Sequence, residues 1–230
     1  MLIDTHLHEN IFSSDSRLDF RDAIKMAKQR GLDAICITNH DNNRFRELIG
    51  DSAMIDGILV LVGSEVYTRE GDILTFGLPD IPELKEPRIP AKELLEQVKA
   101  AGGVAIAAHP YRHNMRGLGD HILRLKDLLH GVESFNGSTF PEDNQRALRT
   151  AIRAGLPSSG AGDAHVAKQV GVFATRFNAN IRDLKDFIEA VKSADFSPYQ
   201  YQPEGYQALI AEMTPDTQRP SYLSDSSGQY

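Results

Sequence analysis

The sequence predicts an α/β fold in which strands alternate with helices. Two observations predict this class. Short apolar runs typical of buried strands alternate along the 230 residues with amphipathic stretches of helical period. Glycine and proline stand at the boundaries, as where Gly31 ends one helical stretch and Pro90 begins another. The alternation is typical of parallel βαβ units, and it leaves open whether the sheet closes into a barrel.

The predicted elements follow this alternation along the chain. The apolar run 2–7 is followed by a helical pattern over 18–30, so the chain begins as a strand and then a helix. The runs 57–67 and 72–78 are both apolar, and their short polar link favours a hairpin. Further strands are predicted at 33–38, 104–108, 131–135, 156–161 and 170–177, and further helices at 44–49, 90–101, 118–129, 141–154 and 181–192.

The composition changes after residue 195. Residues 196–230 hold five of the seven tyrosines, four of the eleven prolines and no lysine. We therefore expect residues 1–195 to form the folded domain and residues 196–230 to form a tail or an appended cap.

Charge and cysteine content exclude several classes of protein. Hydrophobic residues make up 41% and charged residues 25% of the chain, which are the proportions of a folded globular protein. The net charge of −7 offers no field for capturing long polyanions. Cys36 is the single cysteine, which excludes a disulfide framework and a thiolate metal site. With no basic leader and no apolar run of about 18 residues, we expect a cytoplasmic protein without a membrane partner.

Histidines and acids gather at the ends of the predicted strands, the edge where α/β folds build their sites. His6 and His8 stand two apart, so the twofold period of a strand points both rings to one side. The other candidates at strand ends are His40, Asp41, Glu65, His109, Asp163 and His165. Each alone has an ordinary structural explanation, such as a helix cap. Together they would repel one another without cations, and imidazole with carboxylate favours Zn, Mn or Fe(II).

Six ordered motifs make the sequence recognisable. They are Asp4-Thr5-His6-Leu7-His8, Ser14-Asp15, Thr38-Asn39-His40-Asp41, Gly63-Ser64-Glu65, Ala108-His109-Pro110 and Asp163-Ala164-His165. In this order they closely resemble the PHP (polymerase and histidinol phosphatase) superfamily. The resemblance implies a distorted (β/α)7 TIM-like barrel, two or three divalent metal ions on its C-terminal face, and phosphoesterase activity.

The resemblance also implies a set of metal ligands. The first metal would be held by His6, His8, Asp163 and a bridging Glu65, the second by Glu65 and His109, and the third by Asp15, His40 and His165.

Asp72 departs from the family pattern, because relatives often carry a histidine at the start of this strand. One possibility is that Asp72 ligates the second metal, which would favour Mn or Fe. The other is that this metal binds weakly and Asp72 is a turn residue after Gly71.

The loop 111–117 follows His109 directly and carries two arginines. Arg112 and Arg116 predict an anionic substrate, since guanidinium grips phosphate oxygens in bidentate fashion, and Arg17 is a further candidate. The segment 133–137 would either hydrogen-bond a metal ligand or line a leaving-group pocket. The catalytic candidates are Arg112 and Arg116 to hold phosphate, Asp163 or His165 to manage the proton of the attacking water, and His113 to protonate the leaving group.

We therefore expect a metal-dependent hydrolase that cleaves a phosphate ester of a small molecule, a phosphomonoester or a nucleotide, by a metal-bridged hydroxide. The expected partner is a small phosphorylated substrate, with nucleic acid limited to short ends or mononucleotides and the oligomeric state left open. One alternative is an amidohydrolase-like metal-dependent hydrolase of a C–N or lactone bond, and another is a non-catalytic module that binds metal or an anion. The sequence has no Walker motif, nucleophile elbow or dinucleotide fingerprint.

Overall fold

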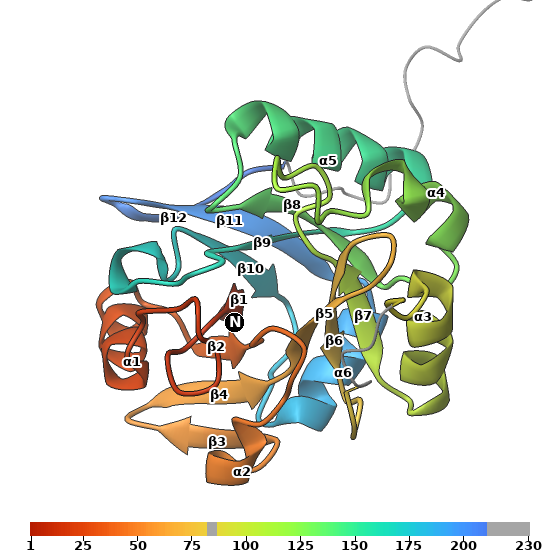
Figure 1. Cartoon of the computed structure of the whole chain (residues 1–230). Coiled ribbons are helices and arrows are strands. Elements are labelled where there is room, and N and C mark those ends of the chain that lie inside the picture. The colour runs from red at the N-terminus through yellow and green to blue at the C-terminus, as the bar shows by residue number, and fades with distance from the viewer. Residues whose placement is uncertain (82–86, 211–230) are drawn as a thin grey trace, which may run out of the picture.

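The strands form two sheets with helices packed outside them (Figure 1), in a computed structural model that describes residues 1–81 and 87–210. The seven-stranded sheet has the order β12 (Gly205–Ala208), β11 (Phe196–Gln202), β10 (Phe173–Phe177), β1 (Leu2–Leu7), β2 (Ala34–Ile37), β4 (Ile58–Val62) and β3 (Ser52–Ile55). The five-stranded sheet has the order β5 (Ser64–Tyr67), β6 (Asp72–Phe76), β7 (Val104–Ala107), β8 (Gly131–Asn136) and β9 (Ser158–Ala161).

The helices lie mostly within the predicted ranges. They are α1 (Phe20–Gln29), α2 (Arg46–Ile49), α3 (Ala91–Ala100), α4 (Ile122–Leu125), α5 (Pro141–Ala154) and α6 (Leu184–Lys192). The predicted helix 118–129 is shorter than expected, because a 3-10 turn at Gly119–His121 precedes the single turn α4. Within residues 1–81 and 87–210, no helix has both the length and the apolar character needed to cross a bilayer.

The α/β class is confirmed, but the described strands do not join into one closed sheet. The two sheets meet through single bridges, one between Leu7 and Ala164 and one between His40 and Glu65. Parallel pairing is found between β1 and β2, β2 and β4, β7 and β8, and β8 and β9. The antiparallel pairing of β5 with β6 is the expected hairpin, whereas the antiparallel pairs of β6 with β7 and of β10 with β1 depart from the parallel βαβ units that we expected. The barrel implied by the resemblance is therefore not seen as a closed barrel.

Gly63 divides the run 57–67 into two strands of different sheets. A Cβ atom on Gly63 would lie 2.5 Å from the ring of Phe76 and 2.7 Å from the carbonyl oxygen of Thr75, so only glycine allows this close passage. The run therefore leaves the large sheet after β4 and enters the small one as β5, where it forms the expected hairpin with β6. This change of sheet brings Glu65 beside His40.

The central strands are buried on both faces. In β7, Val104 and Ile106 join an apolar cluster with Phe187 of α6, whereas Ala105 and Ala107 face a second cluster that includes residues of α3 and α4. This alternation follows the twofold period of a strand and explains why the strands appear in the sequence as continuous apolar runs. The strand ends are thus held by packing on both sides.

Residues 196–208, which we expected in a tail or cap, instead form two strands of the large sheet. β11 pairs antiparallel with β10 from end to end, and β12 pairs with β11. Phe196 packs on Phe177, with ring centroids 5.1 Å apart. Aromatic residues are frequent in strands, so the tyrosines of this stretch fit a sheet better than a tail. Residues 211–230, the rest of the expected tail, lie outside the described residues.

Candidate metal centre

The predicted ligands converge at one edge of the strands. Three sets of side chains place their ligand atoms within 4.8 Å of one another, namely His6 with His8 and Asp163, His6 with Glu65 and His109, and His8 with His40 and His165. These residues come from the ends of β1, β2, β7 and β9 and from the middle of β5, far apart in the sequence. The structure therefore brings together seven of the nine predicted ligands in overlapping groups.

His6 and His8 lie at the end of β1 on either side of Leu7, whose side chain packs in the core. Their Nε2 atoms are 3.0 Å apart. The twofold period of the strand explains why both rings point to the same side. Both residues are completely buried.

Glu65 is at the centre of the cluster. Its Oε1 lies 2.7 Å from His109 Nε2, and its Oε2 lies 2.9 Å from His40 Nδ1 and 3.3 Å from His6 Nε2. Burial alone would raise the pKa of Glu65, but the imidazoles of His6 and His109 lower it well below its ordinary value. An ionised carboxylate in this position can bridge two cations.

Asp163 faces His6 and His8 from the loop after β9. Its Oδ1 lies 3.5 Å from His6 Nε2 and 3.4 Å from His8 Nε2. The backbone φ angles of Asp163 and His109 are 48° and 23°, positive values that residues other than glycine rarely adopt. Such backbone costs about 1–3 kcal/mol per residue and gathers at functional sites.

The third group, His8 with His40 and His165, is more exposed than the other two, and Asp15 lies beside it, outside the three groups. Asp15 Oδ2 lies 3.1 Å from His40 Nε2 and 3.3 Å from His165 Nε2. Half of the Asp15 side chain, 51%, is accessible to solvent, whereas His8 is completely buried. The site therefore runs from a buried end at His6 to an open end at Asp15.

Asp72 lies beside the cluster and outside its three groups. Because β6 runs antiparallel to its neighbours, its first residue falls at the edge where the other strands end. Asp72 Oδ2 is 3.9 Å from His109 Nε2, and Oδ1 accepts hydrogen bonds of 2.9 and 3.3 Å from Arg116. Burial together with Glu65 raises the pKa of Asp72 to about 7. Oδ1 of Asp72 is thus paired with Arg116, and Oδ2 is the oxygen that faces His109.

The donor set fits cations. Glu65 Oε2 and Asp163 Oδ1 are buried and, within the described part of the chain, accept no hydrogen bond. Buried polar atoms are ordinarily paired, so oxygens left in this way among imidazoles indicate a place for positive charge. Imidazole and carboxylate ligands without thiolate suit Zn, Mn or Fe(II).

Glu133 supports the cluster from β8. Its Oε1 lies 2.9 Å from His6 Nδ1, and its Oε2 accepts a hydrogen bond of 2.8 Å from the backbone N–H of His109. Together with Glu65 and Asp163, Glu133 raises the pKa of His6 well above its ordinary value, against the lowering effect of burial. Of the two roles considered for the segment 133–137, Glu133 has the first, since it bonds a predicted ligand.

Glu9 is a buried acid that the sequence analysis missed. Its carboxylate accepts 2.6 Å hydrogen bonds from Asn39 Nδ2 and from the backbone N–H of Ile11, and one of 3.0 Å from Phe12 N. It thereby ties the loop after His8 to the end of β2. The signal in the sequence that could have identified Glu9 was its position directly after His8.

Of the residues predicted to act on the substrate, some reach the cluster and others do not. Arg112 Nη1 donates a 2.6 Å hydrogen bond to Asp163 Oδ2, and Arg116 bonds Asp72, so both guanidinium groups reach the cluster. His113 lies instead 2.9 Å from Asp143 and packs on Phe140, and 70% of its side chain is exposed. Arg17 reaches His165 through its backbone N–H.

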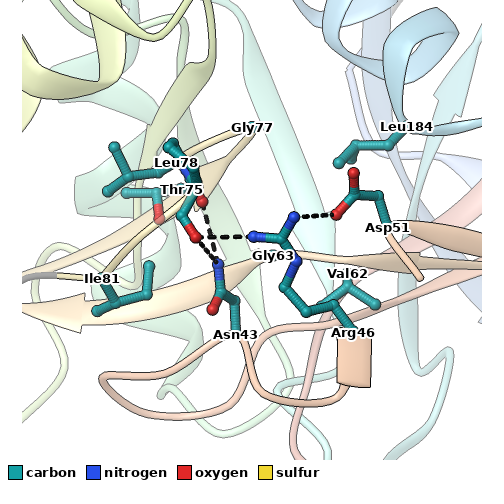
Figure 2. A pocket seen from close by; sticks show the side chains of 11 residues that line it. Asn43, Arg46, Asp51, Val62, Gly63, Thr75, Gly77, Leu78, Ile81 and Leu184 are labelled. Carbon is teal, nitrogen blue, oxygen red and sulfur yellow. Dashed lines mark hydrogen bonds and ion pairs between the residues drawn. The ribbon is translucent and has the colours of Figure 1, made fainter. Parts of the chain in front are cut away.

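A separate cavity of about 140 Å³ lies away from these residues (Figure 2). Asn43 and Arg46 donate hydrogen bonds to the carbonyl oxygens of Leu78 and Pro79, and Arg46 pairs with Asp51 at 3.0 Å. The polar groups drawn in this cavity satisfy one another, and no predicted ligand lines it.

Comparisons with known proteins agree with the geometry. A family model described as PHP-associated matches residues 141–196. The uncharacterized protein MJ1587 of Methanocaldococcus jannaschii is 38% identical over 123 residues, which cover 53% of this chain and 68% of that protein.

Solved structures share the fold. PsfC from Pseudomonas syringae superposes with a TM-score of 0.65 at 19% identity, covering 86% of this chain and 90% of PsfC. A two-domain protein from Bacteroides vulgatus that contains a predicted PHP-like metal-dependent phosphoesterase gives a TM-score of 0.62 at 24% identity, covering 87% of this chain and 64% of that one. With its ordered motifs, its family match and the relative from Methanocaldococcus jannaschii, the chain belongs to the PHP superfamily.

Proposed function

We propose that the chain is a metal-dependent hydrolase that cleaves the phosphate ester of a small molecule, a phosphomonoester or a nucleotide. The observation that carries this proposal is the overlap of three imidazole and carboxylate groups around Glu65, with Arg112 and Arg116 at their border. The Bacteroides vulgatus protein that shares this fold contains a predicted PHP-like metal-dependent phosphoesterase, which supports the reaction class.

Two or three divalent ions, Zn, Mn or Fe, would be held by the grouped side chains. The ligands we propose are His6, His8, Glu65, His109, Asp163, His40, His165 and Asp15, with Asp72 as a further candidate. When bound, such ions supply Lewis acidity toward phosphoryl oxygens and lower the pKa of water. The overlap of the groups at His6 and His8 favours more than one ion.

The chain's own residues would orient the substrate and handle protons. Arg112 contacts the cluster at Asp163, and Arg116 contacts Asp72 beside it. Two guanidinium groups in these positions can hold the phosphate oxygens of one substrate between them. His165 is partly exposed at the open end of the cluster and can accept the proton of an attacking water. His113 would protonate the leaving group only if its loop left Asp143.

Metal content and turnover test the proposal together. The purified chain is analysed for bound metal and then assayed with Mn, Zn or Fe(II) on small phosphomonoesters, nucleotides, amides and lactones. We expect metal in the protein and metal-dependent release of phosphate. Metal-dependent cleavage of amides or lactones alone would favour the amidohydrolase-like alternative, and metal binding without any turnover would favour a binding module.

Replacing Arg112 and Arg116 with alanine is expected to weaken substrate binding. Each hydrogen bond between charged groups contributes about 1.5–3 kcal/mol, so KM for a phosphomonoester should rise roughly 10-fold to 100-fold per arginine. Lysine at either position should recover little, because it cannot form the bidentate contact. Steady-state kinetics measure the effect.

The matched control for these variants is Arg182→Ala, which removes an exposed arginine paired with Asp186 on α6. An unchanged KM in both Arg112→Ala and Arg116→Ala would contradict the role of this loop in binding phosphate.

Glu133→Gln is expected to weaken metal binding without abolishing it. Residues that hydrogen-bond a histidine ligand typically contribute about 10-fold to 100-fold to metal affinity. Glutamine keeps the shape of Glu133 but replaces one carboxylate oxygen with an NH2 group. Either His6 Nδ1 or His109 N would then face this NH2 group and lose its hydrogen-bond acceptor. Titration with Mn2+ against a chelating dye measures the affinity, and Glu142→Gln in the first turn of α5 is the control. Equal affinities of Glu133→Gln and the wild type would refute the role of Glu133.

A further inference from the structure

The loop 162–171 carries two of the proposed ligands, Asp163 and His165, and both of its ends are held by one buried carboxylate. Asp4 lies on β1, two residues before His6, and is completely buried. Its Oδ1 accepts a 2.9 Å hydrogen bond from Gly162 N, and its Oδ2 accepts a 2.7 Å hydrogen bond from Gly171 N. Asp4 belongs to the first motif of the sequence, yet it lies in none of the ligand groups.

The two glycines make this contact possible. A Cβ atom on Gly162 would lie 2.7 Å from Asp4 Oδ2 and 2.5 Å from the carbonyl oxygen of Gln169. Gly171 has φ +72°, and a Cβ atom there would lie 2.6 Å from the hydroxyl of Tyr206. Glycine at 162 therefore lets the backbone approach the carboxylate, and glycine at 171 allows the positive φ and the close approach of Tyr206.

The C-terminal hairpin holds the same loop from the other side. Tyr206 of β12 donates a 2.7 Å hydrogen bond from its hydroxyl to Gly171 O. Arg30, at the end of α1, donates to the carbonyl oxygens of Val170 and Lys168, and its guanidinium lies over the ring of Tyr201. Tyr206, which we expected in a tail, thus contacts the loop that carries Asp163, and Tyr201 contacts Arg30, which bonds the same loop.

The contacts continue inside the loop to the ligands themselves. Gln169 Oε1 accepts hydrogen bonds from the backbone N–H groups of His165, at 3.0 Å, and Val166. Asp4 Oδ1 also lies 3.3 Å from His6 N, so one side chain joins the backbone of two ligand segments. Ligands held within fractions of an ångström bind metal more tightly than ligands on a free loop.

We propose that Asp4 and Tyr206 are positioning residues, which clamp the ends of the loop 162–171 and so hold Asp163 and His165 in place for metal. This inference rests on the proposed function, since it requires the cluster to bind metal. It assigns a role in the site to the hairpin β11–β12, which contributes no ligand.

Three variants of the full chain test the clamp. Asp4→Asn replaces one acceptor oxygen with an N–H donor, which would face a backbone N–H of Gly162 or Gly171. Tyr206→Phe removes only the hydroxyl that bonds Gly171. Tyr201→Phe is the matched control, because it alters a neighbouring tyrosine of the hairpin whose hydroxyl makes no hydrogen bond within residues 1–81 and 87–210.

Two measurements separate positioning from general stability. Titration with Mn2+ and Zn2+ gives the metal affinity, and thermal unfolding with and without metal gives the shift in Tm that the metal causes. We expect Asp4→Asn to weaken binding about 10-fold to 100-fold, the range found for residues that orient ligands, and Tyr206→Phe about 3-fold to 10-fold. The metal-dependent shift in Tm should shrink in the same order, and Tyr201→Phe should match the wild type.

A purely structural role would lower Tm equally with and without metal and would leave the affinity unchanged, and this result would overturn the proposal. If Asp4→Asn does not fold, Tyr206→Phe alone tests the proposal, since it removes a single, partly buried hydrogen bond. A wild-type chain that binds metal while both variants bind it equally well refutes the clamp alone. A wild-type chain that binds no metal refutes both the clamp and the proposed function.

Discussion

Glu65→Ala is expected to lower the hydrolysis of phosphomonoesters at least about a thousandfold, which corresponds to about 4 kcal/mol of transition-state stabilisation. Glu65 lies within 3.4 Å of His6, His8, His40 and His109, so its removal disturbs all of the proposed metal positions at once. The bound metal should fall together with kcat. Steady-state kinetics and elemental analysis of the same sample measure both.

The isosteric variant Glu65→Gln separates charge from shape. It keeps the volume of the side chain and one carbonyl oxygen, so we expect an intermediate loss of activity. Glu47→Ala, an exposed acid on α2, is the control for the loss of a negative charge. Glu65→Ala protein that folds and retains a tenth of the wild-type activity would show that Glu65 does not bridge the reaction centre.

The second large effect is expected on stability. Saturating Mn2+ or Zn2+ should raise the midpoint of thermal unfolding by roughly 8–16 °C over the protein in chelator. A ligand at a thousand times its Kd contributes about 4 kcal/mol, and each kcal/mol raises Tm by about 2–4 °C in a chain of this size. The physical reason is that buried Glu65 and Asp163 gain partners for oxygens that accept no hydrogen bond among the described residues.

Scanning calorimetry with chelator, Mn2+, Zn2+ and Ca2+ measures this stabilisation. Ca2+ prefers ligand sets made only of oxygen, so it should have a much smaller effect than the ions that accept imidazole. Glu65→Ala should lose most of the shift. The same Tm in chelator and in all three metals would show that the cluster binds none of these ions under the conditions used.

Most of the candidate centre could be predicted from the sequence because strand ends are visible there. The apolar runs locate the strands, and the residues that follow them fall at one edge for simple geometric reasons. His8, His40 and His165, which follow β1, β2 and β9, were found in this way, and their rings meet in the structure.

The arrangement of the strands was harder to predict, because it depends on contacts between distant residues. The change of sheet at Gly63 is decided by the ring of Phe76, and nothing in the local sequence marks it. The reversed direction of β6 explains how Asp72 reaches the edge from the start of a strand. The hairpin of β11 and β12 was missed because the change of composition after residue 195, with four prolines and no lysine in residues 196–230, resembles that of a tail, although tyrosine is common in strands.

The buried acids that hold the ligands were the least visible. Glu133 and Asp4 accept hydrogen bonds from backbone N–H groups of distant segments, and Glu9 accepts one from the side chain of Asn39. These bonds exist only once the segments have met. A sequence shows which residue types can bind metal, but not which neighbours will orient them. Glu133 was considered only as part of the segment 133–137, with its role left open between two possibilities.

The two single bridges between the sheets bear on how the protein assembles. One bridge joins Leu7 to Ala164 and the other joins His40 to Glu65, so each lies beside proposed ligands. A cation bound by the proposed ligands beside these bridges would crosslink the two sheets, much as a disulfide crosslinks two segments. Because its ligands extend from His6 to His165, this crosslink could form only after the distant segments of both sheets had come together.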